Sequence, residues 1–153
     1  MWLSAFPTYS SETRYGEKML IGKITEEELN KEFPIFWVNA EQYTPDEEAV
    51  MRLKALTERI DLVLFLGTWC PDSHKEAPKL IKIYNLAGNP NLSLTICGVD
   101  RTKKDPDGMA EKHSITRVPT TIILRDNKEL GRIVEYPKKS VEHDLLDFVE
   151  GGM

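Results

Sequence analysis

The chain has 153 residues, 41% hydrophobic and 29% charged, a composition typical of one globular domain. Its formal net charge of −5 argues against a nucleic-acid partner, and no Lys/Arg cluster marks a surface for anionic membranes. The longest apolar run, residues 62–66, is far too short to span a bilayer, and two cysteines are too few for a secreted disulfide scaffold.

The N-terminal part of the chain gives mixed signals. Residues 1–24, rich in Ser, Thr, Tyr and Gly, are expected to form an irregular arm. Residues 1–10 lack the basic start and apolar stretch of a signal peptide, which indicates a cytoplasmic protein; an exported protein whose leader has been removed is the alternative. Residues 25–28 form a capping box that opens a short helix to Glu32. Residues 34–43 are predicted as a strand from their aromatic and β-branched content, with a helical turn as the alternative.

The middle of the chain predicts a helix, a strand and a second helix. Residues 44–47 form a second capping box with proline at the first helical position, and apolar residues then recur at helical spacing to Ile60. Residues 61–66 are apolar enough for a strand covered on both faces. A helix beginning at Cys70 is expected to reach about Ala87, with Pro78 inside it.

The last third predicts three strands and a helix. Residues 92–99 form a strand, residues 105–108 begin a loop or short helix, and residues 121–125 and 129–135 form an antiparallel hairpin. Ser140 caps a final amphipathic helix. This order of elements predicts an α/β fold in which helices flank a mixed central sheet.

The motif Trp69-Cys70-Pro71-Asp72-Ser73 directly follows the predicted strand 61–66. A cysteine where a helix begins faces unpaired backbone N–H groups and the positive end of the helix dipole, and both favour the thiolate. The thiolate is the nucleophilic form of cysteine. Ser73 occupies the position where a dithiol site carries its second cysteine.

These residues resemble the thioredoxin superfamily, whose members carry a tryptophan before the reactive cysteine, CxxC at the helix start and a proline eight residues after the first cysteine. Pro78 stands at that distance, and residues 113–120 resemble the segment that carries the superfamily's cis-proline. The pattern is similar to monothiol (CxxS) bacterial thioredoxin-like proteins. The resemblance implies a thioredoxin-like three-layer sandwich over residues 45–153, with residues 1–44 as an extension packed on that single domain.

The resemblance also implies a substrate site. The Val118–Pro119 bond is expected to be cis, with Pro119 beside the Cys70 sulfur and Val118 docking an extended substrate by its backbone. Trp69 and Pro71 are expected to line the same groove. Arg117 is expected at the rim of the pocket, either attracting an anionic substrate such as the carboxylate of glutathione or serving as surface charge.

Three departures from the family pattern remove the second half of dithiol exchange. Ser73 leaves no resolving thiol, and Leu64 replaces the buried aspartate that thioredoxins place six residues before the cysteine. The strand 92–99 also lacks the lysine that partners this aspartate. Cys97 lies deep within that strand, so we expect it to be a small core residue instead of a resolving thiol.

Neighbours of Cys70 have competing interpretations. Ser73 either donates a natural hydrogen bond to the thiolate or is a laboratory Cys→Ser change that traps mixed disulfides in a dithiol CPDC oxidoreductase. Asp72 complements the helix terminus but repels a thiolate, and a solvated acid is the plainer interpretation. His74 either lends positive charge to the thiolate or is an exposed residue of the first turn.

The preferred hypothesis is thiol–disulfide exchange, of isomerase or dethiolation type, through the single nucleophile Cys70. The expected partners are a disulfide-containing protein or a low-molecular-weight thiol adduct, and an external thiol reductant. The cysteines and histidines lack metal-ligand spacing, so neither a metal nor a cofactor is expected. The alternatives are a redox-inactive peptide-binding module and, more weakly supported, a thiol peroxidase. The sequence does not define the oligomeric state.

Overall fold

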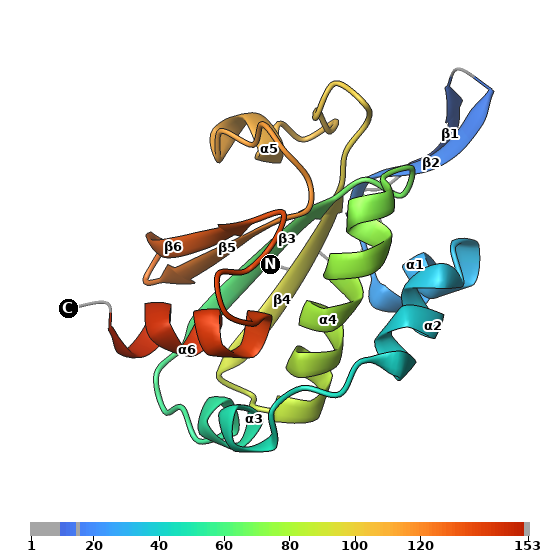
Figure 1. Ribbon diagram of the computed structural model, residues 1–153. Helices are drawn as coiled ribbons and strands as arrows, with labels where there is room; N and C mark the ends of the chain where they lie inside the picture. Colours follow the sequence, from blue (N-terminus) through green and yellow to red (C-terminus); the bar gives the residue numbers. More distant parts are fainter. Residues whose placement is uncertain (1–9, 15, 152–153) are drawn as a thin grey trace.

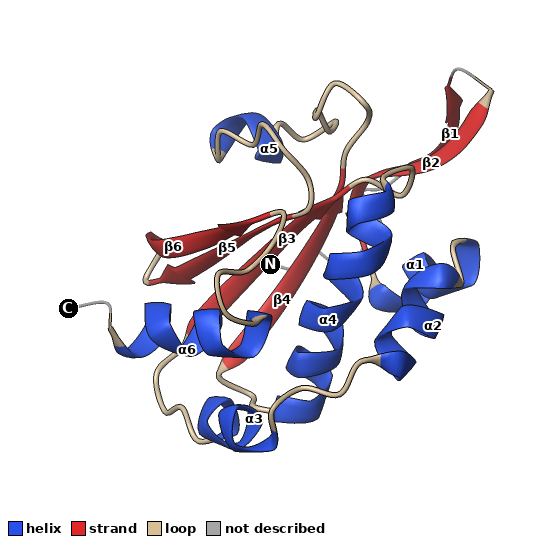
Figure 2. Ribbon diagram, in the orientation of Figure 1, coloured by secondary structure: helices blue, strands red, loops and turns tan. Residues whose placement is uncertain are grey.

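The computed structural model describes residues 10–14 and 16–151 (Figure 1). Within these residues, six strands form one sheet in the order β1-β2-β4-β3-β5-β6, and six helices surround it (Figure 2). The strands are β1 (Ser10–Arg14), β2 (Glu17–Ile24), β3 (Ile60–Leu66), β4 (Leu92–Gly98), β5 (Thr120–Arg125) and β6 (Lys128–Val134). The helices are α1 (Glu26–Glu32), α2 (Ile35–Gln42), α3 (Glu47–Lys54), α4 (Pro71–Ala87), α5 (Met109–Lys112) and α6 (Val141–Glu150).

The sheet is mixed, as the order of elements predicted. Strands β3 and β4 are parallel, and α4 connects them, whereas β5 pairs antiparallel with β3 and β6 pairs antiparallel with β5. The parallel pair brings the carboxyl ends of β3 and β4 to one edge of the sheet, where α4 begins (Figure 1). The predicted α/β sandwich is therefore confirmed.

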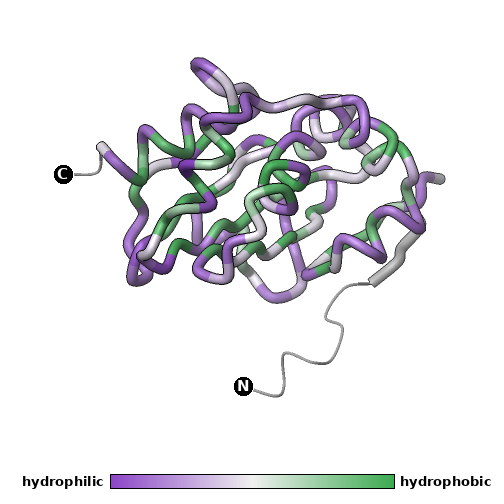
Figure 3. The backbone as a smooth tube through the Cα atoms, turned by 90° about the horizontal axis from the view of Figure 1, so that it is seen from below, coloured by the Kyte–Doolittle hydropathy of each residue, from purple (hydrophilic) through white to green (hydrophobic). Residues whose placement is uncertain are grey.

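Side chains of β3 alternate between two apolar clusters, one on each face of the sheet. Leu62, Leu64 and Leu66 belong to the larger cluster, which includes residues of α1, α2, α3, α4 and α6. Val63 and Phe65 face the smaller cluster, which includes Ala110 of α5 together with Cys70, Cys97, Val99, Ile115, Val118 and Ile122. The chain segments with the most hydrophobic residues run through the middle of the molecule, and the outer turns carry more hydrophilic residues (Figure 3).

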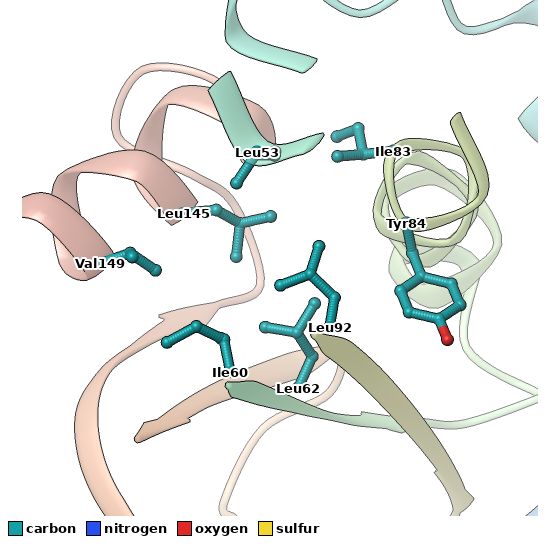
Figure 4. Close-up of a pocket in the computed structure, with 8 residues that line it drawn as sticks. All are labelled: Leu53, Ile60, Leu62, Ile83, Tyr84, Leu92, Leu145 and Val149. Atoms are coloured by element: carbon teal, nitrogen blue, oxygen red, sulfur yellow. The ribbon is translucent and has the colours of Figure 1, made fainter. Parts of the chain in front are cut away.

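The larger cluster contains a cavity of about 10 Å³, roughly the space of one water molecule. Side chains of β3, β4, α3 and α6 point toward one another around it, while the hydroxyl of Tyr84 points away (Figure 4). The lining residues are Leu53, Ile60, Leu62, Ile83, Tyr84, Leu92, Leu145 and Val149. Because this lining offers almost no polar partner, the cavity belongs to the core and is no candidate site.

The irregular arm predicted for residues 1–24 is wrong where the structure describes it. Strands β1 and β2 form an antiparallel hairpin, and β2 also pairs antiparallel with β4 (Figure 1). Met19, Leu20 and Ile21 are consecutive buried residues, because β2 is covered on both faces. This pairing links segments far apart in the sequence, so no local pattern signals it. Residues 1–9 lie outside the described residues.

The strand predicted for residues 34–43 is also wrong, because α2 occupies this segment. Strand propensity describes how well a residue fits a half-buried pleated surface, and here the segment packs against α4 away from the sheet. Phe36 is buried and meets the His74 ring edge-on, with the ring centroids 5.3 Å apart. Trp37 and Val38 remain exposed.

Helix termini follow the predicted chemistry closely, with one shift. Thr25 and Glu28 form the expected capping box at the start of α1. The second capping box is wrong: Asp46 caps α3, and its carboxylate accepts a hydrogen bond from the Ala49 N–H at 3.0 Å. Helix α3 ends at Lys54 instead of continuing to Ile60, which begins β3. The predicted cap of α6 by Ser140 is confirmed.

Gly98 tests whether the N-terminal hairpin is part of the sheet. A Cβ atom at this position would lie 2.2 Å from the Leu20 carbonyl oxygen, a backbone atom that cannot move without opening the β2–β4 pair. We expect Gly98→Ala to lower the free energy of unfolding by about 2 to 3 kcal/mol in urea titrations. Gly108→Ala is the control: its Cβ meets no atom within 4 Å, and only its positive φ costs about 1 kcal/mol. An unchanged stability in Gly98→Ala would contradict the pairing.

Candidate functional site

Cys70 is the N-cap residue of α4, four residues after β3 ends. Its N–H donates to the Gly67 carbonyl at 3.0 Å, and its carbonyl accepts from the His74 N–H at 3.0 Å. Pro71 occupies the first helical position, where the missing N–H costs nothing. Cys70 is 8% exposed, so its thiol lies at the boundary between the small apolar cluster and solvent.

The Val118–Pro119 peptide bond is cis, which confirms the sequence prediction. The Cys70 thiol donates to the Val118 carbonyl, with the sulfur and oxygen 3.6 Å apart. Two hydrogen bonds hold this segment: the Thr120 hydroxyl donates to the Arg117 carbonyl, and the Glu135 N–H donates to the Pro119 carbonyl, both at 2.7 Å. The Val118 N–H lies outside the strand ladders and makes no hydrogen bond within the described residues.

Trp69 forms one wall beside the cysteine. Its indole N–H donates to the Val99 carbonyl at 2.9 Å, which ties the ring to the carboxyl end of β4. The ring also covers Gly67 so closely that a Cβ there would lie 2.6 Å from it. Trp69 is therefore held from two sides and only partly buried. The structure thus brings together Trp69, Cys70 and the Val118–Pro119 segment, as predicted.

Ser73 is fully buried and does not make the hydrogen bond to Cys70 that we expected. Its hydroxyl oxygen accepts from the Gly67 N–H at 3.1 Å, and the described residues provide it with no bond to the sulfur. The hydroxyl therefore ties the first turn of α4 to the segment leaving β3. In this arrangement Ser73 positions the backbone around Cys70.

Asp72 is not simply a solvated acid, because its carboxylate has a partner in the fold. Its carboxylate accepts a 2.5 Å hydrogen bond from the hydroxyl of Tyr136, which follows β6. This bond, with smaller contributions from nearby acids, raises the pKa of Tyr136 to about 12. The hydrogen bond holds the Asp72 carboxylate beside the segment that follows β6.

His74 is oriented by the backbone and not by the thiol. Its Nε2 lies 2.6 Å from the Thr68 carbonyl, which can only accept, so Nε2 carries the proton. The ring packs edge-on against Phe36, and the His74 carbonyl accepts from the Asn39 amide at 2.7 Å. Its contacts join α4 to α2, and they give no support to the predicted electrostatic role.

Arg117 lies two residues before the cis-proline, with its side chain 68% exposed. Its guanidinium pairs with the Glu135 carboxylate at 3.4 Å. The predicted place near the rim is consistent with this position, but the nearby carboxylate offsets the charge that would attract an anion.

Cys97 occupies the interior of β4 and is fully buried. Burial, with nearby acids, raises the pKa of its thiol well above the ordinary range. Neither cysteine forms a disulfide. Cys97 therefore matches the core residue that the sequence predicted.

Glu76 was missed by the sequence interpretation. It is 5% exposed on α4, with one carboxylate oxygen 3.1 Å from the Lys79 ammonium and the other without a partner among the residues that the structure describes. It lines a cavity of about 10 Å³ together with Leu64, Pro119 and Glu135. The chain thus keeps a buried carboxylate near Leu64, although α4 supplies it instead of β3. Its position four residues before the buried Leu80, on the same helical face, was the available signal.

Over the residues that the structure describes, no group of three His, Cys, Asp or Glu side chains converges to hold a metal ion. Over the same residues, no helix has the length and apolar character needed to cross a bilayer.

Comparison with known proteins defines the class. A family model described as thioredoxin matches residues 26–145. Because this match covers well over half of the chain, the protein belongs to the thioredoxin family. A search of curated proteins found no match. Membership of this family makes thiol–disulfide chemistry the class of function to consider.

Solved structures agree on the fold. A protein of unknown function from Pseudomonas aeruginosa is 20% identical, with a TM-score of 0.60 over 84% of this chain and 88% of that one. An HIV epitope-scaffold is 21% identical, with a TM-score of 0.58 over 86% and 85%. At these identities the likeness concerns the fold alone.

The buried carboxylate of Glu76 predicts a measurable cost. One oxygen of the Glu76 carboxylate lacks a partner, and burying a charged group costs more than burying a neutral amide of the same shape, which glutamine supplies. We expect Glu76→Gln to raise the free energy of unfolding by about 1 kcal/mol in urea titrations. Glu150→Gln, which breaks an exposed pair with Arg52, should change it by less than about 0.5 kcal/mol. A clear loss of stability in Glu76→Gln would mean that the charge holds the fold.

Proposed function

We propose that the protein carries out thiol–disulfide exchange through the single nucleophile Cys70. The observation that supports this most is the position of its sulfur, at the start of α4 and 3.6 Å from the Val118 carbonyl. The helix terminus favours the thiolate, and the adjacent backbone offers a place for an extended substrate. Cys97 is buried and its raised pKa keeps it a thiol, so it is not a competing nucleophile.

The exchange step is a displacement at sulfur. The Cys70 thiolate attacks one sulfur of the substrate disulfide, a new bond to Cys70 forms as the substrate S–S bond breaks, and the departing thiolate leaves with the bonding electron pair. Because serine occupies position 73, no neighbouring thiol resolves the mixed disulfide. An external thiol, or a second thiol of the substrate, then attacks and releases Cys70. The outcome is isomerisation or dethiolation, without net reduction by this chain.

The substrate would lie along the segment that ends in the cis-proline. The Val118 N–H has no partner within the described residues, so it can donate to the backbone of an extended chain. Trp69 and Pro71 are the chain neighbours of Cys70, and Pro119 directly follows Val118. These residues would hold a disulfide-containing protein or a low-molecular-weight thiol adduct in line with the sulfur.

A second candidate function is a redox-inactive binding module. One observation favours it: Cys70 is only 8% exposed and its thiol donates to the Val118 carbonyl, a bond that requires the protonated form. A module of this kind would use the same groove to hold a peptide and would leave the sulfur unreacted.

Substitution of each cysteine separates the two functions. We expect Cys70→Ser to abolish mixed-disulfide formation with bis(2-hydroxyethyl) disulfide, measured by intact mass, because the less buried of the two thiols is lost. Cys97→Ala, which keeps that buried position apolar, should form the adduct close to the wild-type rate. Circular dichroism of both variants checks that each is folded.

Two outcomes would overturn the assignment. Equal loss of adduct in both folded variants would mean that Cys70 is not the specific nucleophile. Absence of any adduct in the wild-type protein, under conditions where a small free thiol reacts, would favour the binding module.

A further inference from the structure

Two cations lie over the ring of Trp69, the residue directly before Cys70 in the chain. The guanidinium carbon of Arg101 is 4.8 Å from the ring centroid, and the ammonium of Lys103 is 5.5 Å from it. Both distances are within the range of cation–π attraction. The two residues belong to the loop 100–104, which leaves the carboxyl end of β4 beside the start of α4 (Figure 1). We call Trp69, Arg101 and Lys103 the basic wall.

The loop that carries the basic wall is fixed by its own backbone. The Asp100 carboxylate accepts from the Thr102 N–H, the Thr102 hydroxyl and the Lys104 N–H, at 2.8, 2.6 and 3.1 Å. The Asp100 N–H donates to the Lys104 carbonyl, and the Lys103 N–H to the Asp100 carbonyl. Lys103 has a φ of 63°, an unfavourable conformation for a residue with a Cβ. The hydrogen bonds of this turn therefore fix the backbone position of Lys103.

The charges around the sulfur are unevenly distributed. Arg101 pairs with Glu17 at 2.6 Å, which offsets its charge, whereas Lys103 has no carboxylate partner within the described residues and donates only to the Arg101 carbonyl at 3.3 Å. Asp72, the acid closest in sequence to the sulfur, is held by Tyr136. Lys103 is thus the cation of the basic wall that pairs with no carboxylate of the described residues, and it lies over the ring of Trp69.

We propose that the basic wall selects disulfides that carry a carboxylate or other anion close to the sulfur atoms. This inference rests on the proposed exchange function and names the class of its substrate. The anionic group lies against Lys103 while the disulfide reaches Cys70, and the attraction raises the concentration of anionic substrate at the sulfur. The bonds that form and break are those of the exchange step described above.

A matched set of small disulfides tests the selection. The set consists of dithiodipropionate, which is anionic, bis(2-hydroxyethyl) disulfide, which is neutral, and cystamine, which is cationic. The rate of Cys70 adduct formation is measured by intact mass at low salt. Each rate is divided by the rate of the same disulfide with N-acetylcysteine amide, which removes differences in intrinsic reactivity. We expect the order anionic, neutral, cationic, and a smaller spread at high salt.

Lys103→Gln is the diagnostic variant, and its readout is the ratio of the anionic to the neutral rate. We expect this ratio to fall about threefold, the effect of one charge several ångströms away in a watery site. Lys128→Gln is the control. It makes the same change of charge at the turn of the β5–β6 hairpin, at the end of β5 away from the Val118–Pro119 segment, and it should leave the ratio unchanged.

The outcomes distinguish failure of the anion selection from failure of the exchange function. Equal normalised rates for the three disulfides, or an unchanged ratio in Lys103→Gln, would overturn the selection while leaving exchange by Cys70 intact. Absence of an adduct with all three disulfides would overturn the exchange function, and the selection with it.

Discussion

The contact between the Cys70 sulfur and the Val118 carbonyl joins two segments that are 48 residues apart, and the rest of the site depends on it. Strand pairing makes the contact possible. Strands β3 and β5 are antiparallel, with Phe65 opposite Thr120, so the end of β3 and the start of β5 meet at one edge. Cys70 follows the first strand and Val118 precedes the second. A change that slips this register would separate the sulfur from the groove.

The surroundings of the sulfur divide by charge. On one side lies the basic wall of Trp69, Arg101 and Lys103, carried by the loop after β4. Elsewhere near the site, Asp72 and Glu135 are engaged by Tyr136 and Arg117, and Glu76 is buried. A thiolate beside carboxylates is repelled, and the Arg117 guanidinium offsets the charge of Glu135. The helix terminus supplies the opposite effect on the thiolate.

Signals that act over a few residues predicted their structures well. The capping box at Thr25, the start of α4 at Cys70 and the cap at Ser140 depend on side chains that bond neighbouring backbone groups. The cis bond at Val118–Pro119 came from resemblance to a family and agrees with the structure. The central sheet followed from the order of elements, because parallel strands need a helical crossover.

What the sequence did not predict depends on distant partners. Strand β2 exists because β4 offers an open edge, and nothing in residues 17–24 identifies that edge. Segment 35–42 has strand-like residues but became a helix by packing against α4. The cavity shared by Glu76 and Leu64 likewise required the packing of α4 on the sheet.

The central claim is that Cys70, at the start of α4, is the reactive thiol of this protein. The most direct measurement is the rate of alkylation of the native protein by iodoacetamide across a range of pH, with the modified cysteine identified by mass spectrometry. Our account predicts that Cys70 reacts at neutral pH faster than a free cysteine peptide, while Cys97 stays unmodified until the protein unfolds. Modification of Cys70 only on unfolding, at the same rate as Cys97, would contradict it.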